Sequence, residues 1–455
     1  LAEAHDRAGE FGARDQRHRE AAELARRVDR TDLFVRAALG FGGILPAAAP
    51  PNPDASALLE EALDRLPVAD GRYRALALAR YAQVQNLTAP YPQRRAMSDE
   101  AVEMARRIDN PVVLAQVLLA RCLTLDGPDD THEHLTIGAE VTSLGEQTAD
   151  PELVLQGARA RIPALFVLGR HDEARELAAT FTRLADQVRH PDHLRLARMW
   201  VILRTGLEGR FDEAEAMAQR QLDDLLRAGH IQGVGIHFTQ TFGGRWLHGE
   251  LDRSRPALEA MQLVFPSNIR FWAVSLWVDM ASGRWEHALA ELAANDPAQV
   301  AQLPHDYFWW PTMLAWTVVS THRAACGDVD TDWARHLYEA MSPYRGRNCT
   351  MGYAAYGGAV DHHLGTLAAV LDRPDDAVDL LESGLARHEE LDAVGFAALS
   401  TRWLAYALAR RDGPGDHDRA AELLAASRRV EHELGLHGLP PAVDLGQGVG
   451  LGGRS

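Results

Sequence analysis

The apolar residues of this chain recur with the spacing of an α-helix along almost its whole length. Ala174, Leu177, Ala178 and Phe181, for example, occupy positions i, i+3, i+4 and i+7, which share one helix face. Ala, Leu, Arg and Glu, which favour helix, dominate the composition, and the alternating apolar and polar positions that would indicate strands are absent. The pattern therefore predicts an all-α protein.

Several helix starts are marked by a capping residue that is followed by proline. Proline is tolerated at the first position of a helix because its missing N–H has no intrahelical partner there. Four such starts are Asn110-Pro111, Asp150-Pro151, His190-Pro191 and Asp296-Pro297. We expect a helix to begin at each of these prolines.

A six-residue pattern, glycine–polar–apolar–acidic–any–small, recurs where one helix ends and the next begins. Copies start at Gly169, Gly209, Gly249 and Gly283, with a degenerate copy at Gly327, so that successive glycines are 40, 40, 34 and 44 residues apart. The glycine is expected to end one helix in the left-handed conformation, and the acid to cap the next helix. Periods of this length indicate stacked helix pairs of the tetratricopeptide type.

These repeats predict a right-handed α-solenoid of antiparallel, tetratricopeptide-like (TPR-like) helix pairs with a concave surface. The solenoid is expected to run over residues 1–434 without a domain boundary, with degenerate repeats in 1–150 and clearer ones in 151–434. Residues 435–455 are rich in glycine and are expected to form a flexible tail. The tail is similar to a nucleotide-binding loop, but no predicted strand precedes it and no helix follows.

The charged residues narrow the range of functions. All 47 basic residues are arginines, and the absence of lysine excludes a Walker A loop, Schiff-base chemistry and pyridoxal-phosphate catalysis. The net charge of −17 argues against direct binding of nucleic acid, which requires a basic face.

The apolar runs and the cysteines indicate the compartment. No eighteen apolar residues run together, and no signal-peptide pattern follows Leu1. The three cysteines are too few and too scattered for a disulfide framework, so we expect buried structural thiols at Cys122, Cys326 and Cys349. We therefore expect a cytoplasmic protein that does not bind membranes.

Aromatic residues concentrate between residues 237 and 316. Seven of the ten tryptophans lie there, namely Trp246, Trp272, Trp277, Trp285, Trp309, Trp310 and Trp316. Trp272 and Trp277 are roughly 140° apart on a helix, so they lie on different faces. The adjacent Trp309 and Trp310 must likewise divide between core and surface, which places one ring of each pair in the groove. The alternative is that these rings fill the core between repeats, because tetratricopeptide cores also use Trp and Tyr.

Histidines supply the candidate acid–base chemistry. His305 and Asp306 open an aromatic helix predicted over residues 306–326, and His322 lies near its end. His305 and Asp306 form either a His–Asp general-base pair or, if Asp306 caps the helix, a structural helix start. No Gly-x-Ser-x-Gly motif is present to anchor serine-hydrolase chemistry.

Three further polar patterns have structural explanations. His132 and His134 could share a metal ion in a loop, but on a helix they point about 200° apart. The neighbouring His362 and His363 are expected to pack in the core or to line the groove. The acidic pairs are expected on solvated faces, and they are Asp129-Asp130, Asp223-Asp224 and Asp375-Asp376.

Three segments carry a family resemblance: 337–348 (LYEAMSPYRGRN), 356–368 (YGGAVDHHLGTLA) and 377–385 (AVDLLESGL). Together they resemble the C-terminal TPR-like region of large actinobacterial ATP-binding regulators. In that family the solenoid follows an AAA/STAND-type ATPase, often with a LuxR-type DNA-binding domain or a cyclase domain. The opening residues 5–9 and 20–26 look like the junction between ATPase and solenoid. The resemblance implies an arm that binds an effector or a partner, while the Walker motifs and helix-turn-helix are absent here.

We therefore expect a non-catalytic, ligand- or partner-sensing arm of an ATP-dependent transcriptional or signalling regulator. Its partners would be a small-molecule effector or a protein, with an ATPase domain N-terminal to it in the parent chain and neither metal nor cofactor. The residues expected to line the groove are Trp272, Trp277, His305, Trp309, Trp310, His322, Tyr353, Tyr356 and His362. Two alternatives stay open: a stand-alone enzyme or binding protein of secondary metabolism, with His305 or His322 as acid–base residue, and a protein-interaction scaffold.

Overall fold

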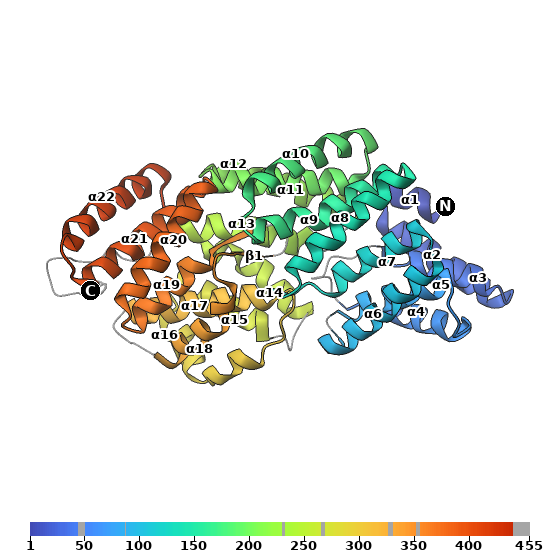
Figure 1. The fold of residues 1–455 in the computed structure, drawn as a ribbon, viewed down its shortest axis with the longest axis horizontal. Helices are drawn as coiled ribbons and strands as arrows, with labels where there is room; N and C mark the ends of the chain where they lie inside the picture. The colour runs from blue at the N-terminus through green and yellow to red at the C-terminus, as the bar shows by residue number, and fades with distance from the viewer. Residues whose placement is uncertain are drawn as a thin grey trace.

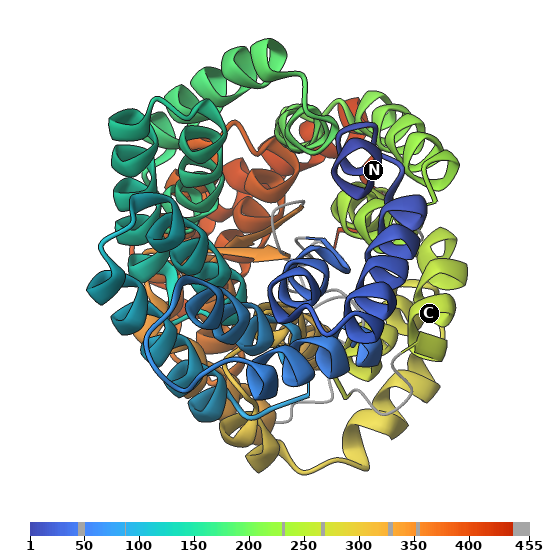
Figure 2. The ribbon, with the colours of Figure 1, turned by 90° about the vertical axis from the view of Figure 1, so that its right-hand side faces the viewer.

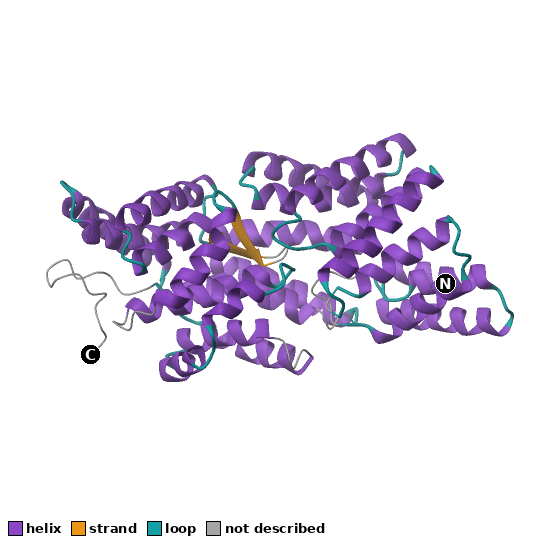
Figure 3. Ribbon diagram, turned by 60° about the horizontal axis from the view of Figure 1, so that its bottom comes forward, coloured by secondary structure: helices purple, strands orange, loops and turns teal. Residues whose placement is uncertain are grey.

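The computed structural model describes residues 1–43, 51–86, 88–229, 233–264, 269–325, 331–351 and 355–439. Within these ranges the chain is helical apart from one short β-hairpin (Figures 1 and 3), so the all-α prediction is confirmed for the fold as a whole. No helix in these ranges is long and apolar enough to cross a lipid bilayer. Tyr353, Cys326, Gly327 and residues 440–455 of the expected tail lie outside the described residues.

The helices follow one another with short connections. The N-terminal helices are α1 (Ala2–Arg7), α2 (Phe11–Arg27), α3 (Thr31–Gly40), α4 (Pro53–Arg65), α5 (Arg72–Val84), α6 (Tyr91–Ile108) and α7 (Pro111–Thr124). The next are α8 (Thr131–Thr148), α9 (Pro151–Val167), α10 (His171–Val188), α11 (Pro191–Leu207), α12 (Phe211–Arg227) and α13 (Gly233–His248).

The second half of the chain mixes α-helices with short 3₁₀ turns and the hairpin. Its helices begin with η1 (Leu251–Ser254), α14 (Arg255–Val264), α15 (Ile269–Ala281), α16 (Trp285–Ala293), η2 (Pro297–Gln302), α17 (Trp309–Ala325), α18 (Thr331–Met341) and η3 (Ser342–Tyr344). The remaining elements are β1 (Asn348–Met351), β2 (Ala355–Ala359), α19 (Val360–Val370), α20 (Pro374–Glu390), α21 (Val394–Arg411) and α22 (Asp416–Leu434).

Helices that are adjacent in sequence contact each other, as expected for a repeat array. The pairs α8 and α9, α19 and α20, and α21 and α22 show this, and next-but-one helices such as α5 and α7 or α15 and α17 also touch. Viewed end on, the chain winds around a central axis, with the strands lying inside the ring of helices (Figure 2). This arrangement is consistent with a solenoid.

The predicted helix starts are confirmed with one variation. Pro111, Pro151 and Pro191 each open an α-helix, and the side chains of Asn110, Asp150 and His190 accept backbone N–H bonds of the first turn. Pro297 also opens a helix behind the capping side chain of Asp296, but this helix is the 3₁₀ helix η2.

The recurring glycines end helices as predicted, but the acids do not cap. Gly169, Gly209, Gly249 and Gly283 have φ between 74° and 81°, the left-handed region that glycine adopts without strain. The capping position after each glycine is an arginine or Glu250, and none of these side chains makes a cap hydrogen bond. The acids lie in the first turn instead, where they complement the positive end of the helix dipole.

The hairpin of β1 and β2 is the one element that the periodicity did not predict. The strands pair antiparallel, with Asn348 opposite Ala359 and Met351 opposite Ala355, and a bulge lies between Cys349 and Thr350. All five residues of β2 are buried. A strand that is buried on both faces has no polar–apolar alternation, so its sequence looks like a short apolar loop or helix segment.

The inner position of the hairpin lets it contact helices from distant parts of the chain. β1 packs against α9 and α17, and β2 packs against α13 and α20. At the other end, the chain stays packed beyond α22: Leu436 and Leu439 are buried, and the Gly438 N–H donates to the Leu247 carbonyl at 2.9 Å. The first residues of the expected tail therefore lie against α13.

Candidate functional site

Three segments that are far apart in the sequence meet inside the ring of helices: residues 126–134, 305–310 and 344–350. The Tyr344 hydroxyl donates to Asp129 Oδ1 at 2.6 Å across 215 residues, and Arg347 Nη1 donates to the Pro128 carbonyl at 2.9 Å across 219 residues. Asn348 Nδ2 donates to the Phe166 carbonyl at 2.8 Å. We call this meeting point the junction. It joins successive turns of the winding chain.

Gly127 allows the closest approach at the junction. A Cβ atom added there would lie 2.1 Å from the His305 carbonyl oxygen, which no side chain could tolerate without moving the backbone. The Gly127 N–H donates to Asp130 Oδ2 at 3.0 Å, which closes a tight turn before α8. Glycine at this position is therefore required by contact with residue 305 and not by local chain geometry alone.

Of the acidic pair Asp129-Asp130, Asp129 is exposed as predicted, but Asp130 is buried. Asp130 is 1% exposed, and it accepts hydrogen bonds from the Tyr91 hydroxyl at 2.6 Å and from Arg95 Nη2 at 3.3 Å. Asp129 is exposed but binds across the junction. The prediction failed for Asp130 because its partners, Tyr91 and Arg95, come from α6, 39 and 35 residues earlier in the sequence.

His305 pairs with Asp129 and not with its neighbour Asp306. His305 Nδ1 lies 2.7 Å from Asp129 Oδ2, and its side chain is 44% exposed. Burial acts to raise the pKa of Asp129, but hydrogen bonds from Tyr344 and His305 outweigh it, so the pKa lies below its usual value. Asp306 instead accepts the Phe308 N–H at 3.0 Å, the capping role that was the structural alternative. The helix itself runs from Trp309 to Ala325.

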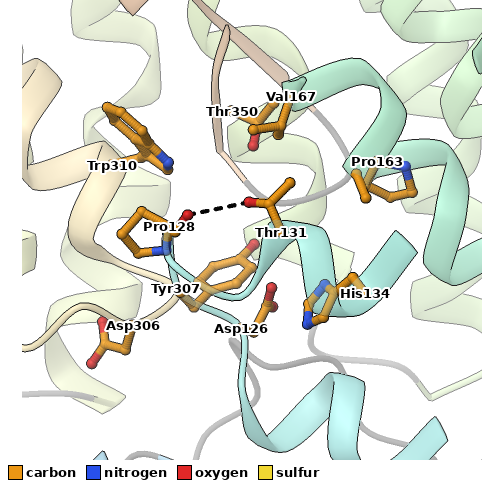
Figure 4. Close-up of a pocket in the computed structure, with 12 residues that line it drawn as sticks. Asp126, Pro128, Thr131, His134, Pro163, Val167, Asp306, Tyr307, Trp310 and Thr350 are labelled. Carbon is orange, nitrogen blue, oxygen red and sulfur yellow. Dashed lines mark hydrogen bonds between the residues drawn. The ribbon is translucent and has the colours of Figure 1, made fainter. Parts of the chain in front are cut away.

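A small cavity of about 60 Å³ lies beside the junction (Figure 4). Its lining comes from Asp126, Gly127, Pro128, Thr131, His134, Pro163, Ala164, Val167, Asp306, Tyr307, Trp310 and Thr350. These residues belong to all three junction segments and to α9. The cavity has room for a small ligand and not only for a single water molecule.

Asp126 carries the unusual electrostatics of the cavity. Its Oδ2 atom is buried and has no hydrogen-bond partner. Burial raises the pKa of Asp126 to about 6, because the charged form loses its hydration. In Figure 4 its carboxylate lies between Tyr307 and His134. Burial also raises the pKa of Tyr307, and the charge of Asp126 adds to this shift.

His134 is fixed beside Asp126 by a backbone bond. Its Nε2 lies 2.5 Å from the Leu125 carbonyl, so Nε2 must carry a proton and donate it. His132 is exposed on another face of α8, as the spacing predicts for a helix. Among the described side chains, no group of three or more His, Cys, Asp or Glu residues is arranged to hold a metal ion.

The predicted division of Trp309 and Trp310 between core and surface is wrong. Trp309 is 1% exposed and Trp310 is 6% exposed, and their rings meet edge to face at 4.7 Å. Both rings also lie against Tyr344, at 5.2 and 5.4 Å. Both are buried because the 344–350 segment covers the helix face that would otherwise be open. Trp310 still borders the cavity.

The other predicted groove residues lie in separate clusters. Trp277 is buried between Phe242 and Trp246, whereas Trp272 is partly exposed and its indole N–H donates to Glu291 at 3.2 Å, so these two rings do differ in exposure. The ring of His322 stacks on Trp285 at 4.1 Å. Tyr356 is buried in the hairpin, against Phe166 and Phe396. The junction thus brings together only His305, Trp309 and Trp310 from the predicted set.

His362 belongs to a buried hydrogen-bond chain. The Ala359 N–H donates to His388 Nε2 at 2.9 Å, which places the His388 proton on Nδ1. That proton is donated to Ser400 Oγ at 2.9 Å, and the Ser400 hydroxyl is then free to donate to His362 Nδ1 at 2.8 Å. Burial lowers the pKa of His388 to about 3 and that of His363 to about 4, and it lowers the pKa of His362 as well. These histidines are neutral core residues.

Asp126 and Tyr344 are the residues of this region that sequence reasoning missed. Asp126 stands in a loop-like stretch, Asp-Gly-Pro-Asp-Asp, whose composition gives no sign of burial. The aromatic cluster at 307–310 was the one local signal that pointed to this region.

Comparisons with known proteins add no name. No known protein-family model matches the chain, and no curated protein matches it. The resemblance to ATP-binding regulators stays a prediction.

Proposed function

We propose that this chain is a ligand-sensing arm of an ATP-dependent regulator, built as a continuous, right-handed, TPR-like solenoid over residues 1–434. One observation supports sensing above all: the cavity is walled by the three junction segments, and the Tyr344–Asp129 hydrogen bond links two of them across 215 residues. A ligand that touches all three walls favours the closed junction over an open one. Its differential affinity for the two states would set how far the solenoid shifts.

The signal would travel through the junction's hydrogen bonds. Tyr344 and Arg347 hold the loop at Pro128 and Asp129, while Asn348 holds α9. These three residues stand just before and at the start of β1, whose hairpin leads directly into α19. Closing or opening the junction would thus move the hairpin and the C-terminal helices behind it, and with them any attached domain.

The test is a fragment screen by ligand-observed NMR against wild type and Gly127→Ala. The added methyl group meets the His305 carbonyl, so it should open the junction and abolish binding of junction ligands. The matched control is Gly12→Ala on α2, where an added Cβ meets nothing within 4 Å. We expect compounds that bind wild type and Gly12→Ala but not Gly127→Ala, with unchanged helical circular dichroism in all three. If no compound separates the variants, the sensing proposal is wrong.

A second candidate, an enzyme, is favoured by the His305–Asp129 pair. The imidazole is half-exposed, its Nδ1 faces a carboxylate, and the Tyr344 hydroxyl lies 3.2 Å away, which is an arrangement used by general bases. Native mass spectrometry of the freshly purified chain distinguishes the two functions. An enzyme would convert a co-purified compound over time and would lose this conversion in His305→Gln, whereas a sensor would release the compound unchanged.

A further inference from the structure

The cavity at the junction is lined by acidic, aromatic and apolar side chains. Two of its lining residues are acids, Asp126 and Asp306, and no arginine is among the lining residues. Tyr307 and Trp310 contribute aromatic faces, and Pro163, Ala164 and Val167 contribute an apolar wall from α9. An anion would meet carboxylates here, so this lining disfavours it.

The two acids differ in what they already bind. Asp306 is committed to the Phe308 N–H at 3.0 Å. Asp126 Oδ2 is buried without any hydrogen-bond partner, which is unfavourable for a carboxylate oxygen. The closest acids on neighbouring elements, Asp129 and Asp130, are bound to His305, Tyr344, Tyr91 and Arg95. Oδ2 of Asp126 is therefore an acceptor that can still bind a hydrogen-bond donor.

From this arrangement we infer that the cavity binds a small organic cation, a primary alkylammonium group, with Asp126 as its counter-ion. An ammonium group has three N–H donors and no acceptor, which suits an unpartnered carboxylate oxygen. The Thr131 hydroxyl donates to the Pro128 carbonyl at 3.2 Å, so its oxygen lone pairs remain able to accept a second N–H. The rings of Tyr307 and Trp310 also line the cavity, and a cation interacts favourably with aromatic rings.

Two other cations fit less well. Ca²⁺ takes six to eight oxygen ligands and Mg²⁺ takes six, which the carboxylate of Asp126 and its neighbours do not supply in the described structure. A guanidinium presents five N–H donors in a planar fork, whereas the cavity is small and its second acid, Asp306, is already engaged with the Phe308 N–H. An alkylammonium with two or three carbons matches both the charge and the volume.

The inference deepens the proposed function, since the ammonium compound would be the ligand that the arm senses. The probe is n-propylammonium, titrated by ligand-observed NMR at pH 7.5, with 1-propanol and propionate as neutral and anionic molecules of the same length. The variants are Asp126→Asn, which keeps the shape and removes the charge, and Asp223→Asn, which removes an exposed carboxylate on α12. For a ligand of this size we expect about millimolar affinity.

We expect wild type and Asp223→Asn to bind propylammonium equally and Asp126→Asn to bind at least tenfold more weakly. Propanol and propionate should not compete. Equal binding by Asp126→Asn, no binding by wild type, or effective competition by propanol would each overturn the inference. If neutral fragments bind at the junction and propylammonium does not, the sensing proposal survives and the ammonium inference fails. If propylammonium binds at Asp126 but leaves residues 344–350 unaffected, the ligand class stands and the sensing proposal fails.

Discussion

The first half of the helix array and the second half have differently organised cores. In the first half the buried apolar residues form consecutive small clusters, at residues 22–62, 75–117, 115–160 and 155–199, each shared by a few neighbouring helices. In the second half a single cluster runs from Leu207 to Leu439 and includes the hairpin. The first half thus resembles a one-dimensional array of nearest-neighbour contacts, whereas we expect the second half, with its continuous core, to unfold as one unit.

The junction connects these two kinds of core. On the side of the first half it uses a polar loop at 126–130, and on the side of the second half it uses the segment that leads into the hairpin. The junction therefore lies between a segmented core and a continuous one. Under the proposed function, a small ligand at this boundary would move one half relative to the other without unfolding either.

The strongest test of the difference between the two cores is to replace one fully buried phenylalanine in each half. Phe242 and Phe34 are both 0% exposed, and each replacement by alanine should lower local stability by about 3–5 kcal/mol. We expect Phe242→Ala to speed amide hydrogen exchange throughout α13 to α22, and Phe34→Ala to speed it only in α2 to α5. Faster exchange that spreads beyond α7 in Phe34→Ala would contradict the claim that the two halves have differently organised cores. Faster exchange confined to α13 in Phe242→Ala would contradict it as well.

Mild acid should weaken α19 to α21 more than α4 to α7. The pKa values of His363 and His388 are lowered in the folded chain to about 4 and about 3, so below pH 6.5 the unfolded chain binds protons that the folded chain does not. Stability is therefore intact above pH 6.5 and falls as the pH drops toward 4, by about 3–4 kcal/mol at pH 5. Exchange protection factors at pH 7 and pH 5 measure this: they should fall in α19 to α21 and hold in α4 to α7, where no histidine occurs. Equal protection of α19 to α21 at both pH values would show that these imidazoles do not resist protonation.

At the boundary, replacement of Asp126 by asparagine should stabilise the unliganded protein. The folded pKa of about 6 lies above the ordinary value of 3.8, so the ionised carboxylate destabilises the fold above pH 6. We expect Asp126→Asn to raise the free energy of unfolding by about 1–3 kcal/mol at pH 7.5, and the gain to shrink as the pH falls through 6 toward 4. Urea unfolding at pH 7.5 and pH 4.5, with Asp223→Asn as control, measures the change. A loss of stability at pH 7.5 would mean that Asp126 has a partner in the apo protein.

The smallest expected effect comes from Tyr344→Phe, which removes one hydrogen bond across the junction. Loss of the bond to Asp129 should cost about 1 kcal/mol and should speed exchange in residues 126–131 as well as 344–350. Changes in only one of these segments would show that the bond does not couple the two halves.

The sequence predicts where helices of this fold begin and end, but it does not predict which distant segments come into contact. The proline starts at 111, 151 and 191 and the left-handed glycines at 169 and 209 follow from backbone chemistry, which acts over a few residues, and they were predicted correctly. The hairpin at 348–359 was not predicted, because burial on both faces removes the alternation that identifies a strand.

The candidate site was predicted less completely than the helices, because its contacts join segments far apart in the sequence. His305 and the aromatic run at 309–310 were identified, but the partner of His305 was expected at Asp306 and is Asp129, 176 residues earlier. Contacts across a turn of the solenoid depend on its pitch and curvature, which helical periodicity does not encode. For the same reason Trp309 and Trp310 were expected to divide between core and groove, while a segment that follows them by more than thirty residues buries both.

The most direct test of coupling through the junction is hydrogen–deuterium exchange of the wild-type chain with and without saturating n-propylammonium. The account predicts slower exchange in residues 126–131 and 344–350 together, and no such change in Asp126→Asn. Slower exchange in the first segment alone, or the same protection in Asp126→Asn, would contradict it.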